Sequence, residues 1–170
     1  MSRPPTVLVV DDDEGLRTLM SESLRAEGCT VATAASATAA REWLNRQAPD
    51  LMILDLKLPD GSGPELVASL QRARTAVPFV VVTGQGDEKV AVEVMKQGAL
   101  DYVMKDTVLL ERLPTVVKRA LKTVAQEAAL QTAQVEYRRL EREIVAISER
   151  ERHSIGADLP DTLGQPLTAL

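Results

Sequence analysis

The stretch LMILDLKLPDGSG, residues 51–63, decides how the rest of the chain must be arranged. Apolar, strand-favouring residues run directly into one carboxylate, Asp55, and a cluster of Pro, Asp, Gly and Ser follows that favours a turn. A short apolar run of this kind is typical of a buried strand in a parallel sheet, and α/β proteins place their chemistry at the carboxyl ends of such strands. Because a carboxylate is costly to bury alone, other parts of the sequence must supply groups that stabilise Asp55.

The overall composition limits the classes of protein to which the chain can belong. Its 170 residues are 45% hydrophobic but only 2% aromatic, which suits one domain with an aliphatic core and an appendage. The formal net charge of −5 and the lack of a strongly basic stretch argue against a nucleic-acid partner. The single cysteine, Cys29, cannot form an internal disulfide, and the apolar run at residues 7–10 is too short to span a membrane. We therefore expect a cytoplasmic protein with no membrane partner.

Short apolar segments alternate with segments of helical periodicity over the first part of the chain. The predicted strands cover residues 6–10, 29–34, 51–55, 79–82 and 101–104. The helices between them are introduced by Asp13, Ser36, Pro64 and Asp87. In the fourth helix we expect Val90, Val94 and Met95 to face inward. This alternation favours an α/β fold with a doubly wound parallel sheet of five strands.

The C-terminal part of the chain has a different character. From Pro114 to about Ile155 the sequence is rich in Ala, Leu, Glu, Arg and Gln, which predicts one long helix. Its apolar residues form two sets, of which the first is expected to pack on the sheet: Leu110, Leu113, Val117, Ala120 and Val124. The second set is spaced strictly by three and four residues: Leu130, Ala133, Tyr137, Leu140, Ile144 and Ile147. We interpret the second set as a coiled-coil seam that forms a homodimer; the alternative is a helix that folds back on its own domain.

Groups that could partner Asp55 also lie at the ends of predicted strands. If the first and third strands are neighbours, Asp11 and Asp12 converge with Asp55 at roughly the 5 Å spacing of paired strands. Three such charges need a cation, and an oxygen-only site of this kind suits Mg²⁺. Lys105 follows the last strand and supplies a fixed positive charge, while Thr83 supplies a hydroxyl group. These are together the components of phosphoryl transfer onto an aspartate.

Four separated motifs occur in order along the chain: VVDDD (9–13), LDLKLPDGSG (54–63), VVTGQG (81–86) and DYVMK (101–105). Residues 6 to about 122 therefore resemble the receiver domain of bacterial two-component response regulators. The resemblance implies a flavodoxin-like fold with strand order 2-1-3-4-5. It also implies a role in a phosphorelay, in which a histidine kinase or a phosphotransfer protein donates the phosphoryl group.

The resemblance also assigns a role to each matching residue around the metal. Asp55 would be the phosphoacceptor. Asp12, Asp55 and the backbone carbonyl of Lys57 would hold Mg²⁺, and Asp11 would act through its water ligands. Lys57 and Gln85 occupy positions that tune the lifetime of the phosphoryl group in this family.

Three further residues are assigned to catalysis and switching by the same resemblance. Lys105 would neutralise the incoming phosphoryl group, and Thr83 would move to hydrogen-bond it. Tyr102 matches the aromatic residue that rotates inward when the threonine moves. One departure from the family pattern is Asp106, which stands where the family often has proline.

The tail SERERHSIGADLPDTLGQPLTAL, residues 148–170, resembles the first half of the dimerisation and phosphotransfer hairpin of histidine kinases. Pro160 stands where that family carries its phosphorylated histidine, and proline has no nucleophilic nitrogen. Histidine autokinase activity is therefore not expected, and His153 is expected to be a solvated helix residue. Asp161 and Gln165 are retained, and in the resembled kinases such a pair orients a water that dephosphorylates a partner receiver. The alternative is that both are ordinary surface residues of a truncated hairpin.

The sequence thus predicts a receiver domain at 1–122, a coiled-coil helix at 123–155 and the start of a kinase-type hairpin at 156–170. The expected function is a phosphorylation-dependent switch that catalyses its own aspartyl phosphorylation and signals through a dimeric coil to a kinase-like output. A phosphatase acting through the tail and a purely structural dimerisation module remain alternatives. A haloacid-dehalogenase-like phosphatase is disfavoured, because Gly15 stands where that pattern needs Thr or Val.

Overall fold

The computed structural model describes residues 3–84 and 86–157. The chain divides into two compact units, Met1–Gln126 and Glu127–Leu170. The first unit contains every described strand and the helices α1 to α4, and α5 (Leu109–Ala157) continues from the first unit into the second.

Five parallel strands form the sheet of the first unit, in the order β2-β1-β3-β6-β7. The strands are β1 (Thr6–Val10), β2 (Thr30–Ala34), β3 (Leu51–Asp55), β6 (Phe79–Thr83) and β7 (Asp101–Met104). Two short segments, β4 (Lys57–Leu58) and β5 (Gly61–Ser62), pair antiparallel in the turn after β3. The predicted doubly wound sheet and its strand order are confirmed.

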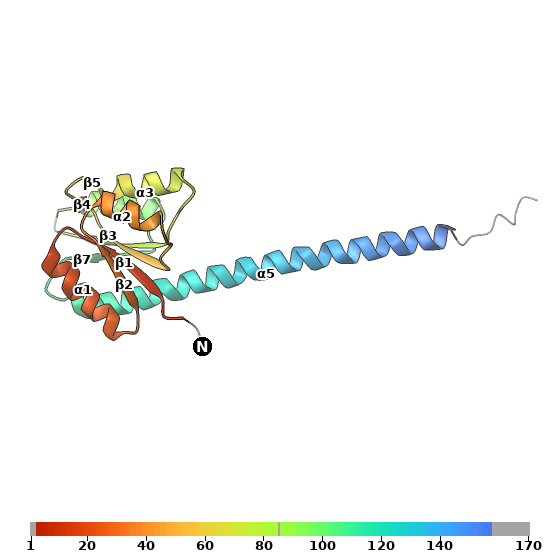
Figure 1. The fold of residues 1–170 in the computed structure, drawn as a ribbon, viewed down its shortest axis with the longest axis horizontal. Coiled ribbons are helices and arrows are strands. Elements are labelled where there is room, and N and C mark those ends of the chain that lie inside the picture. Colours follow the sequence, from red (N-terminus) through yellow and green to blue (C-terminus); the bar gives the residue numbers. More distant parts are fainter. Residues whose placement is uncertain (1–2, 85, 158–170) are drawn as a thin grey trace, which may run out of the picture. The chain divides into compact units, whose positions relative to one another are not determined.

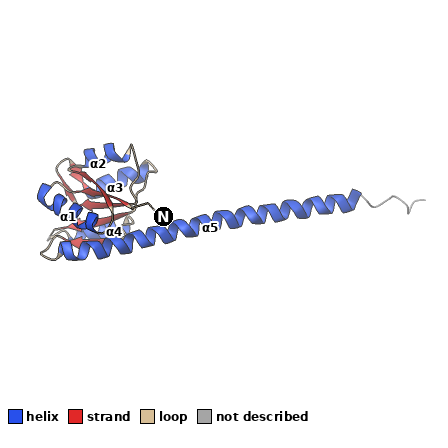
Figure 2. Cartoon of the chain, turned by 60° about the horizontal axis from the view of Figure 1, so that its bottom comes forward, coloured by secondary structure: helices blue, strands red, loops and turns tan. Residues whose placement is uncertain are grey.

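Helices cover both faces of this sheet, as Figures 1 and 2 show. They are α1 (Glu14–Ala26), α2 (Ala37–Leu44), α3 (Gly63–Arg72), α4 (Glu88–Lys96) and the first part of α5. Successive strand residues point to opposite faces, so Val7 and Val9 pack with α1 and α5, whereas Leu8 and Val10 pack with α2, α3 and α4. Burial on both faces explains why the central strands are apolar without a break.

Two predicted capping residues start their helices as expected. The Asp13 Oδ1 atom accepts a hydrogen bond from the Leu16 N–H at 2.9 Å, at the start of α1. The Ser36 Oγ atom accepts one from the Ala39 N–H at 3.1 Å, at the start of α2. Each side chain satisfies a backbone donor that has no partner within its helix.

Helix α3 begins with a capping box that the sequence analysis did not identify. The Ser62 Oγ atom accepts from the Glu65 N–H at 3.3 Å, and the Glu65 carboxylate accepts from the Ser62 N–H at 3.0 Å. The Ser-x-x-Glu spacing that marks such a box is present in the sequence at 62–65. The helix therefore starts at Gly63, one residue before Pro64.

The expected inward face of α4 is wrong at two of three positions. Val94 is buried, but Val90 is 37% exposed and Met95 is 38% exposed. Ala91 takes the second inward position, because it lies three residues before Val94 on the same helix face. Val90 and Met95 lie on the borders of that face.

Helix α5 begins at Leu109, so Pro114 lies inside it rather than at its start. Proline removes one intrahelical hydrogen bond at this position. The neighbouring side chains Leu109, Leu113 and Val117 are fully or almost fully buried against the sheet, and this burial offsets the loss. The predicted long C-terminal helix is confirmed, with an earlier start.

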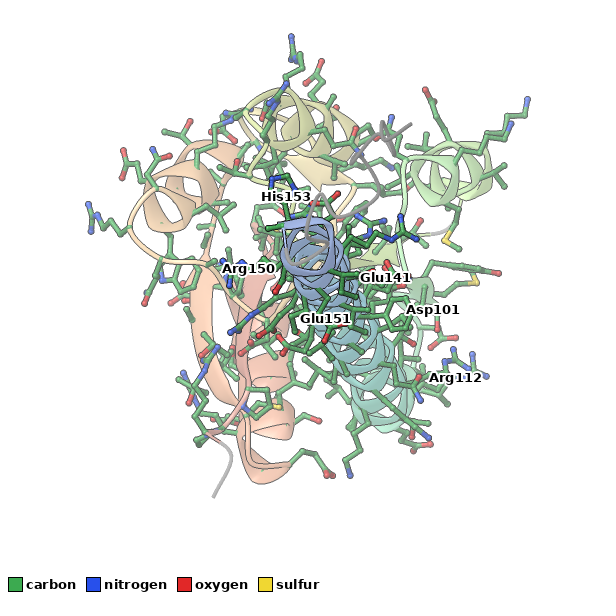
Figure 3. The ribbon with its side chains drawn as sticks, turned by 90° about the vertical axis from the view of Figure 1, so that its right-hand side faces the viewer. Asp101, Arg112, Glu141, Arg150, Glu151 and His153 are labelled. Atoms are coloured by element: carbon green, nitrogen blue, oxygen red, sulfur yellow. The ribbon has the colours of Figure 1, made fainter. Side chains whose placement is uncertain are left out.

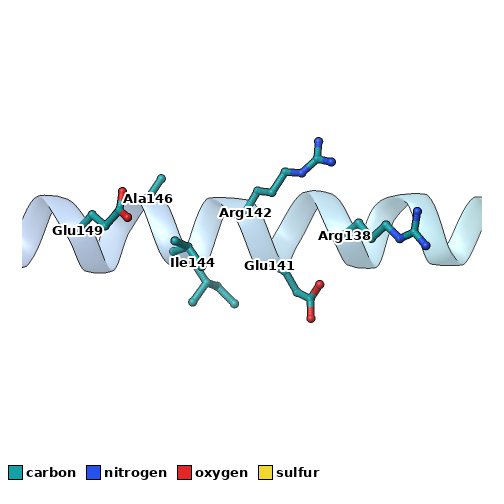
Figure 4. Close-up of a pocket in the computed structure, with 7 residues that line it drawn as sticks. Arg138, Glu141, Arg142, Ile144, Ala146 and Glu149 are labelled. Atoms are coloured by element: carbon teal, nitrogen blue, oxygen red, sulfur yellow. The ribbon is translucent and has the colours of Figure 1, made fainter.

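From Glu127 to Ala157 every residue of α5 is exposed. Exposed apolar side chains of the predicted seam include Leu130, Tyr137, Leu140, Ile144 and Ile147. Figure 4 shows Ile144 and Glu141 projecting from one side of α5, with Arg142 and Ala146 on the other. Among the described residues, no helix has the combination of length and apolar character that crossing a bilayer requires.

Candidate functional site

Three carboxylates meet at the carboxyl edge of the sheet. β1 and β3 pair in parallel with Val10 opposite Leu54, so Asp11 and Asp55 leave the two strands at the same level. Asp12 follows Asp11, and one oxygen from each of the three carboxylates lies within 4.8 Å of the others. Asp11 and Asp55 are buried, whereas Asp12 is exposed. The convergence predicted from strand order is therefore present.

Lys105 links two of these carboxylates. Its Nζ atom lies 2.7 Å from Asp55 Oδ2 and 2.9 Å from Asp11 Oδ2. The backbone places it there, because the Lys105 N–H donates to the Thr83 carbonyl oxygen at 2.8 Å and so extends the pairing of β6 with β7. One ammonium group thus faces two buried carboxylates.

Burial and charge act in opposite directions on these groups. Loss of solvent raises the pKa of Asp55, although the hydrogen bond and the charge of Lys105 act to lower it. Burial acts to lower the pKa of Lys105, but Asp55 and Asp11 outweigh it, and the net shift is upward. Lys105 therefore stays protonated, while the Asp55 carboxylate remains short of counter-charge.

The acidic set fits a hard divalent cation. All the candidate ligand atoms are carboxylate oxygens, which Mg²⁺ prefers. The Asp11 Oδ2 atom is buried and has no hydrogen-bond donor in suitable geometry among the described residues; Lys105 Nζ is its close charged neighbour. A buried oxygen in that situation can accept a further positive charge.

Thr83 lies at the end of β6, the strand next to the one that carries Asp55. Its side chain is buried, and its hydroxyl donates to the Gly84 carbonyl oxygen at 3.3 Å. Thr83 also lines a cavity of about 160 Å³ together with Met95, Tyr102 and Met104. Tyr102 as a whole residue is 51% exposed to solvent.

Lys57 contacts the site through its backbone. Its N–H donates to Asp55 Oδ1 at 3.3 Å. Its side chain points elsewhere, with Nζ at 2.9 Å from Asp87 Oδ1.

Arg17, which holds the acidic loop through its side chain, was missed by the sequence analysis. The Arg17 guanidinium donates to the carbonyl oxygens of Asp11 and Asp12, at 2.7 and 3.3 Å. The Asp13 N–H donates to Asp11 Oδ1 at 3.0 Å. An arginine one turn into the helix that follows an acidic loop was the available signal.

Asp60 fixes the loop that follows the phosphoacceptor candidate Asp55. Its two carboxylate oxygens accept from the N–H groups of Ala37 and Thr38, each at 2.8 Å. Hydrogen bonds from the side chain and the backbone of Thr38 lower the pKa of Asp60 to about 2. The turn after β3 is thereby tied to the N-terminus of α2.

Asp106 shapes the loop that follows Lys105. Its Oδ1 atom accepts from the Val108 N–H at 3.1 Å, and its carbonyl oxygen accepts from the Leu109 N–H at 3.1 Å. The aspartate therefore forms the turn that leads into α5.

Comparison with known proteins identifies this arrangement. Residues 7–118 match the family model of the response regulator receiver domain. The chain belongs to this family. Receiver domains bind Mg²⁺ at an acidic pocket and generally take their phosphoryl group from histidine kinases, and this receiver has the corresponding cluster of aspartates.

Relatives of this receiver include transcriptional regulators. It is 36% identical over 156 residues to the transcriptional regulatory protein FixJ of Rhizobium meliloti, covering 89% of this chain and 72% of FixJ. It is 31% identical to the C4-dicarboxylate transport transcriptional regulatory protein DctD of the same organism, covering 88% of this chain but only 31% of DctD.

Solved structures of receiver domains superpose on the same part of the chain. The receiver domain of NtrX from Brucella abortus is 34% identical, with a TM-score of 0.64 over 69% of this chain and 98% of that domain. The signal receiver domain of a Luxo repressor protein from Vibrio parahaemolyticus gives a TM-score of 0.69 at 29% identity, over 75% of this chain and 97% of that domain.

Not every residue singled out in the sequence lies in the described part of the chain. Gln85, Pro160, Asp161 and Gln165 lie outside the residues that the structure describes, so their assigned roles stay predictions. His153 is described and is exposed on α5, where Figure 3 shows it projecting outward with Arg150 and Glu151.

Proposed function

We propose that the chain is a phosphorylation-dependent signalling switch that accepts a phosphoryl group on Asp55 from a histidine kinase or a phosphotransfer protein. The observation that carries this proposal is the buried Asp55 carboxylate with the Lys105 ammonium at 2.7 Å and two more aspartates beside it. An Asp55 oxygen would form the new bond to phosphorus as the phosphorus–nitrogen bond of the donor histidine breaks. The departing imidazole takes up a proton.

Each neighbouring residue has a distinct part in this proposal. Asp11, Asp12 and Asp55 would hold Mg²⁺, with the Lys57 carbonyl as a further ligand, and Asp11 would act through water. The bound cation would supply positive charge for the phosphoryl oxygens. Lys105 is already positioned to pair with the same oxygens, and its two carboxylate partners favour its charged form.

Thr83 and Tyr102 are the proposed switch residues. Both border the 160 Å³ cavity, which offers space for the half-exposed Tyr102 ring if Thr83 turns toward a phosphoryl group. The Thr83 hydroxyl now donates to the Gly84 carbonyl oxygen at 3.3 Å, a long bond that a charged phosphoryl oxygen would outcompete. Phosphorylation would thus shift a two-state equilibrium of this region.

The output is proposed to pass through a homodimer. We assign residues 1–122 to the receiver, 123–155 to a dimeric coiled coil and 156–170 to the start of a kinase-type hairpin. The support is the exposed apolar series on α5, since a helix with this spacing of apolar residues gains stability by pairing with another helix.

The proposal is tested with acetyl phosphate or beryllofluoride in the presence of Mg²⁺. With acetyl phosphate, the parent chain should take up one phosphoryl group, and the Asp55→Asn variant should take up none, by mass spectrometry of the intact protein. Sedimentation with and without beryllofluoride then reports whether the dimer responds. An Asp55→Asn chain that is phosphorylated as well as the parent would contradict the proposal.

A further inference from the structure

The cavity between β6, α4 and β7 is lined by uncharged side chains. Its volume is about 160 Å³. The described residues that line it include Thr83 at the end of β6, Ala91, Val92 and Met95 of α4, and Tyr102 and Met104 of β7. None of these described lining residues carries a charge. An ion would lose its solvation in such a place, so the lining favours an uncharged and largely apolar molecule.

The volume of the cavity matches a single aromatic ring. A protein cavity of roughly 150 Å³ with apolar walls is large enough to bind benzene. Ala91 leaves room on the α4 side, because it is buried and its side chain is only a methyl group. Met95 and Met104 are unbranched and polarisable, so they can adapt to a ring and contact it favourably through sulfur.

The lining also offers a partner for one hydroxyl group on such a ring. The Thr83 hydroxyl is buried and donates to the Gly84 carbonyl oxygen at 3.3 Å, which is long for a bond between two oxygens. A hydroxyl oxygen can also accept hydrogen bonds through its lone pairs. Tyr102, whose side chain is itself a phenol, lines the same cavity and is 51% exposed. A phenol ring of the chain therefore lies beside the cavity without full burial.

We propose that this cavity binds a small uncharged phenol, with its ring against Met95 and Met104 and its hydroxyl donating to the Thr83 hydroxyl oxygen. A ligand in this position competes with the Tyr102 ring for the same space. Bound phenol then favours the unphosphorylated conformation, because a ligand that binds one of two states shifts the equilibrium toward that state. The competition rests on the proposed function, whereas the binding site itself does not.

The test titrates the full chain with phenol and follows the methionine methyl groups by NMR. The signals of Met95 and Met104 should shift and saturate in the millimolar range. The signals of Met20 and Met52, which are fully buried and are not among the described lining residues, should not move.

Two comparisons test the chemistry of the ligand. Benzoate should bind at least about ten-fold more weakly than phenol, because its carboxylate would lose solvent. Thr83→Val should weaken phenol binding by about five-fold and leave toluene binding unchanged, because toluene has no hydroxyl group to lose its partner.

A substitution that fills the cavity tests its position. Ala91→Leu should weaken phenol binding by roughly ten-fold or more, because the larger side chain occupies the space of the ring. Val90→Leu is the matched control, since Val90 is the neighbouring residue of α4 and is not among the described lining residues. It should bind phenol as the parent does. Unchanged Met20 and Met52 signals check that both variants keep the fold; if Ala91→Leu alters them, the benzoate and Thr83→Val comparisons decide.

Beryllofluoride with Mg²⁺ tests the competition with Tyr102. It should weaken phenol binding to the parent by about five-fold or more, and should leave binding to Tyr102→Ala unchanged. Equal phenol affinities of the parent with and without beryllofluoride would overturn the competition. The absence of a saturable shift at Met95 and Met104, or equal binding of phenol and benzoate, would overturn the site. A parent chain that takes up no phosphoryl group would instead overturn the proposed function, so the failures are distinguishable.

Discussion

At the scale of single residues, the site contains more negative charge than positive charge. Lys105 provides one positive charge for two buried carboxylates, and exposed Asp12 adds a third negative charge. The pKa of Asp55 is raised by burial despite Lys105, which means that its ionised form is disfavoured in the absence of a cation. A bound metal ion should therefore stabilise the folded protein as well as assist the chemistry.

The excess of negative charge predicts that Mg²⁺ raises the free energy of unfolding, with Asp12 as one of the metal ligands. The gain should be about 2.7 kcal/mol when free Mg²⁺ is about 100-fold above its Kd. Asp12→Asn should lose most of this gain, since it removes one ligand charge. Asp13→Asn is the matched control, because asparagine also caps helices well and Asp13 lies outside the acidic set. The measurement is urea unfolding with and without Mg²⁺, and an equal loss in both variants would contradict the assignment.

A second residue-scale prediction concerns Asp60 and pH. Its pKa is lowered to about 2 from 3.8 by hydrogen bonds to the start of α2, so the ionised carboxylate stabilises the folded state. That contribution is complete above pH 3.8 and is lost as the pH falls through about 2. Asp60→Ala should therefore be less stable than the parent at pH 5, and the difference should shrink toward pH 2. Urea unfolding at several pH values measures it; a difference independent of pH would argue against the carboxylate contacts.

At the scale of elements, helix ends position the loop that follows Asp55. α3 starts at Gly63, whose N–H donates to the Leu56 carbonyl oxygen at 2.9 Å. A Cβ at residue 63 would lie 2.7 Å from the Asp55 carbonyl oxygen, so only glycine allows the helix to approach the end of β3 this closely. The helix and the strand that carries Asp55 are thus fixed to each other by backbone contact.

Gly63→Ala is therefore expected to destabilise the protein by roughly 1–3 kcal/mol, the usual cost of overpacking, and to slow phosphorylation of Asp55. Gly15→Ala is the matched control, since a Cβ there would be 3.4 Å from an Asp13 oxygen and residue 15 is helical. It should be neutral or stabilising by up to about 1 kcal/mol, because alanine favours helix more than glycine does. Thermal unfolding and acetyl phosphate labelling give the two readouts. Equal effects of the two substitutions would exclude the backbone contact as the cause.

At the scale of the whole molecule, α5 is the element shared by the two units. Its first part is held in the receiver by buried Leu113 and Val117 and by an ion pair between Arg119 and Asp101 on β7. Figure 3 labels Asp101 together with Arg112, which pairs with Asp106 at 3.7 Å. Arg112 therefore contacts the loop that follows Lys105, whereas Arg119 contacts the opposite end of β7. Because α5 is one continuous helix, it is the element through which the proposed signal would leave the receiver.

The proposed coiled coil makes a prediction about association. Leu140→Asp should weaken dimerisation strongly, because it places a charge in the seam. Val135→Asp is the matched control: Val135 is also an exposed apolar residue of α5, but it falls outside the spacing of three and four. It should leave the dimer intact. Sedimentation equilibrium measures both, and equal dimer affinities in the two variants would contradict the seam.

The sequence by itself predicted five strands alternating with helices, the long C-terminal helix and the polar residues that meet at the strand ends, whereas the strand order 2-1-3-4-5 was implied by the resemblance to receiver domains. It could do so because apolar periodicity specifies strands and helices, and because parallel strands bring their carboxyl ends to one edge. Each of the four motifs is a short continuous run of residues, so it could be recognised before the tertiary structure was known.

Only the tertiary structure decided which polar groups meet across the loops. Lys57 and Asp87 are 30 positions apart, and Asp60 reaches back to residues 37 and 38. Such pairs carry no periodic signal, because they depend on the distances between loops after the sheet has formed. The inward face of α4 was missed for the same reason: a short helix with apolar residues on several sides is oriented by its packing against the sheet, which burial of Ala91 and Val94 decides.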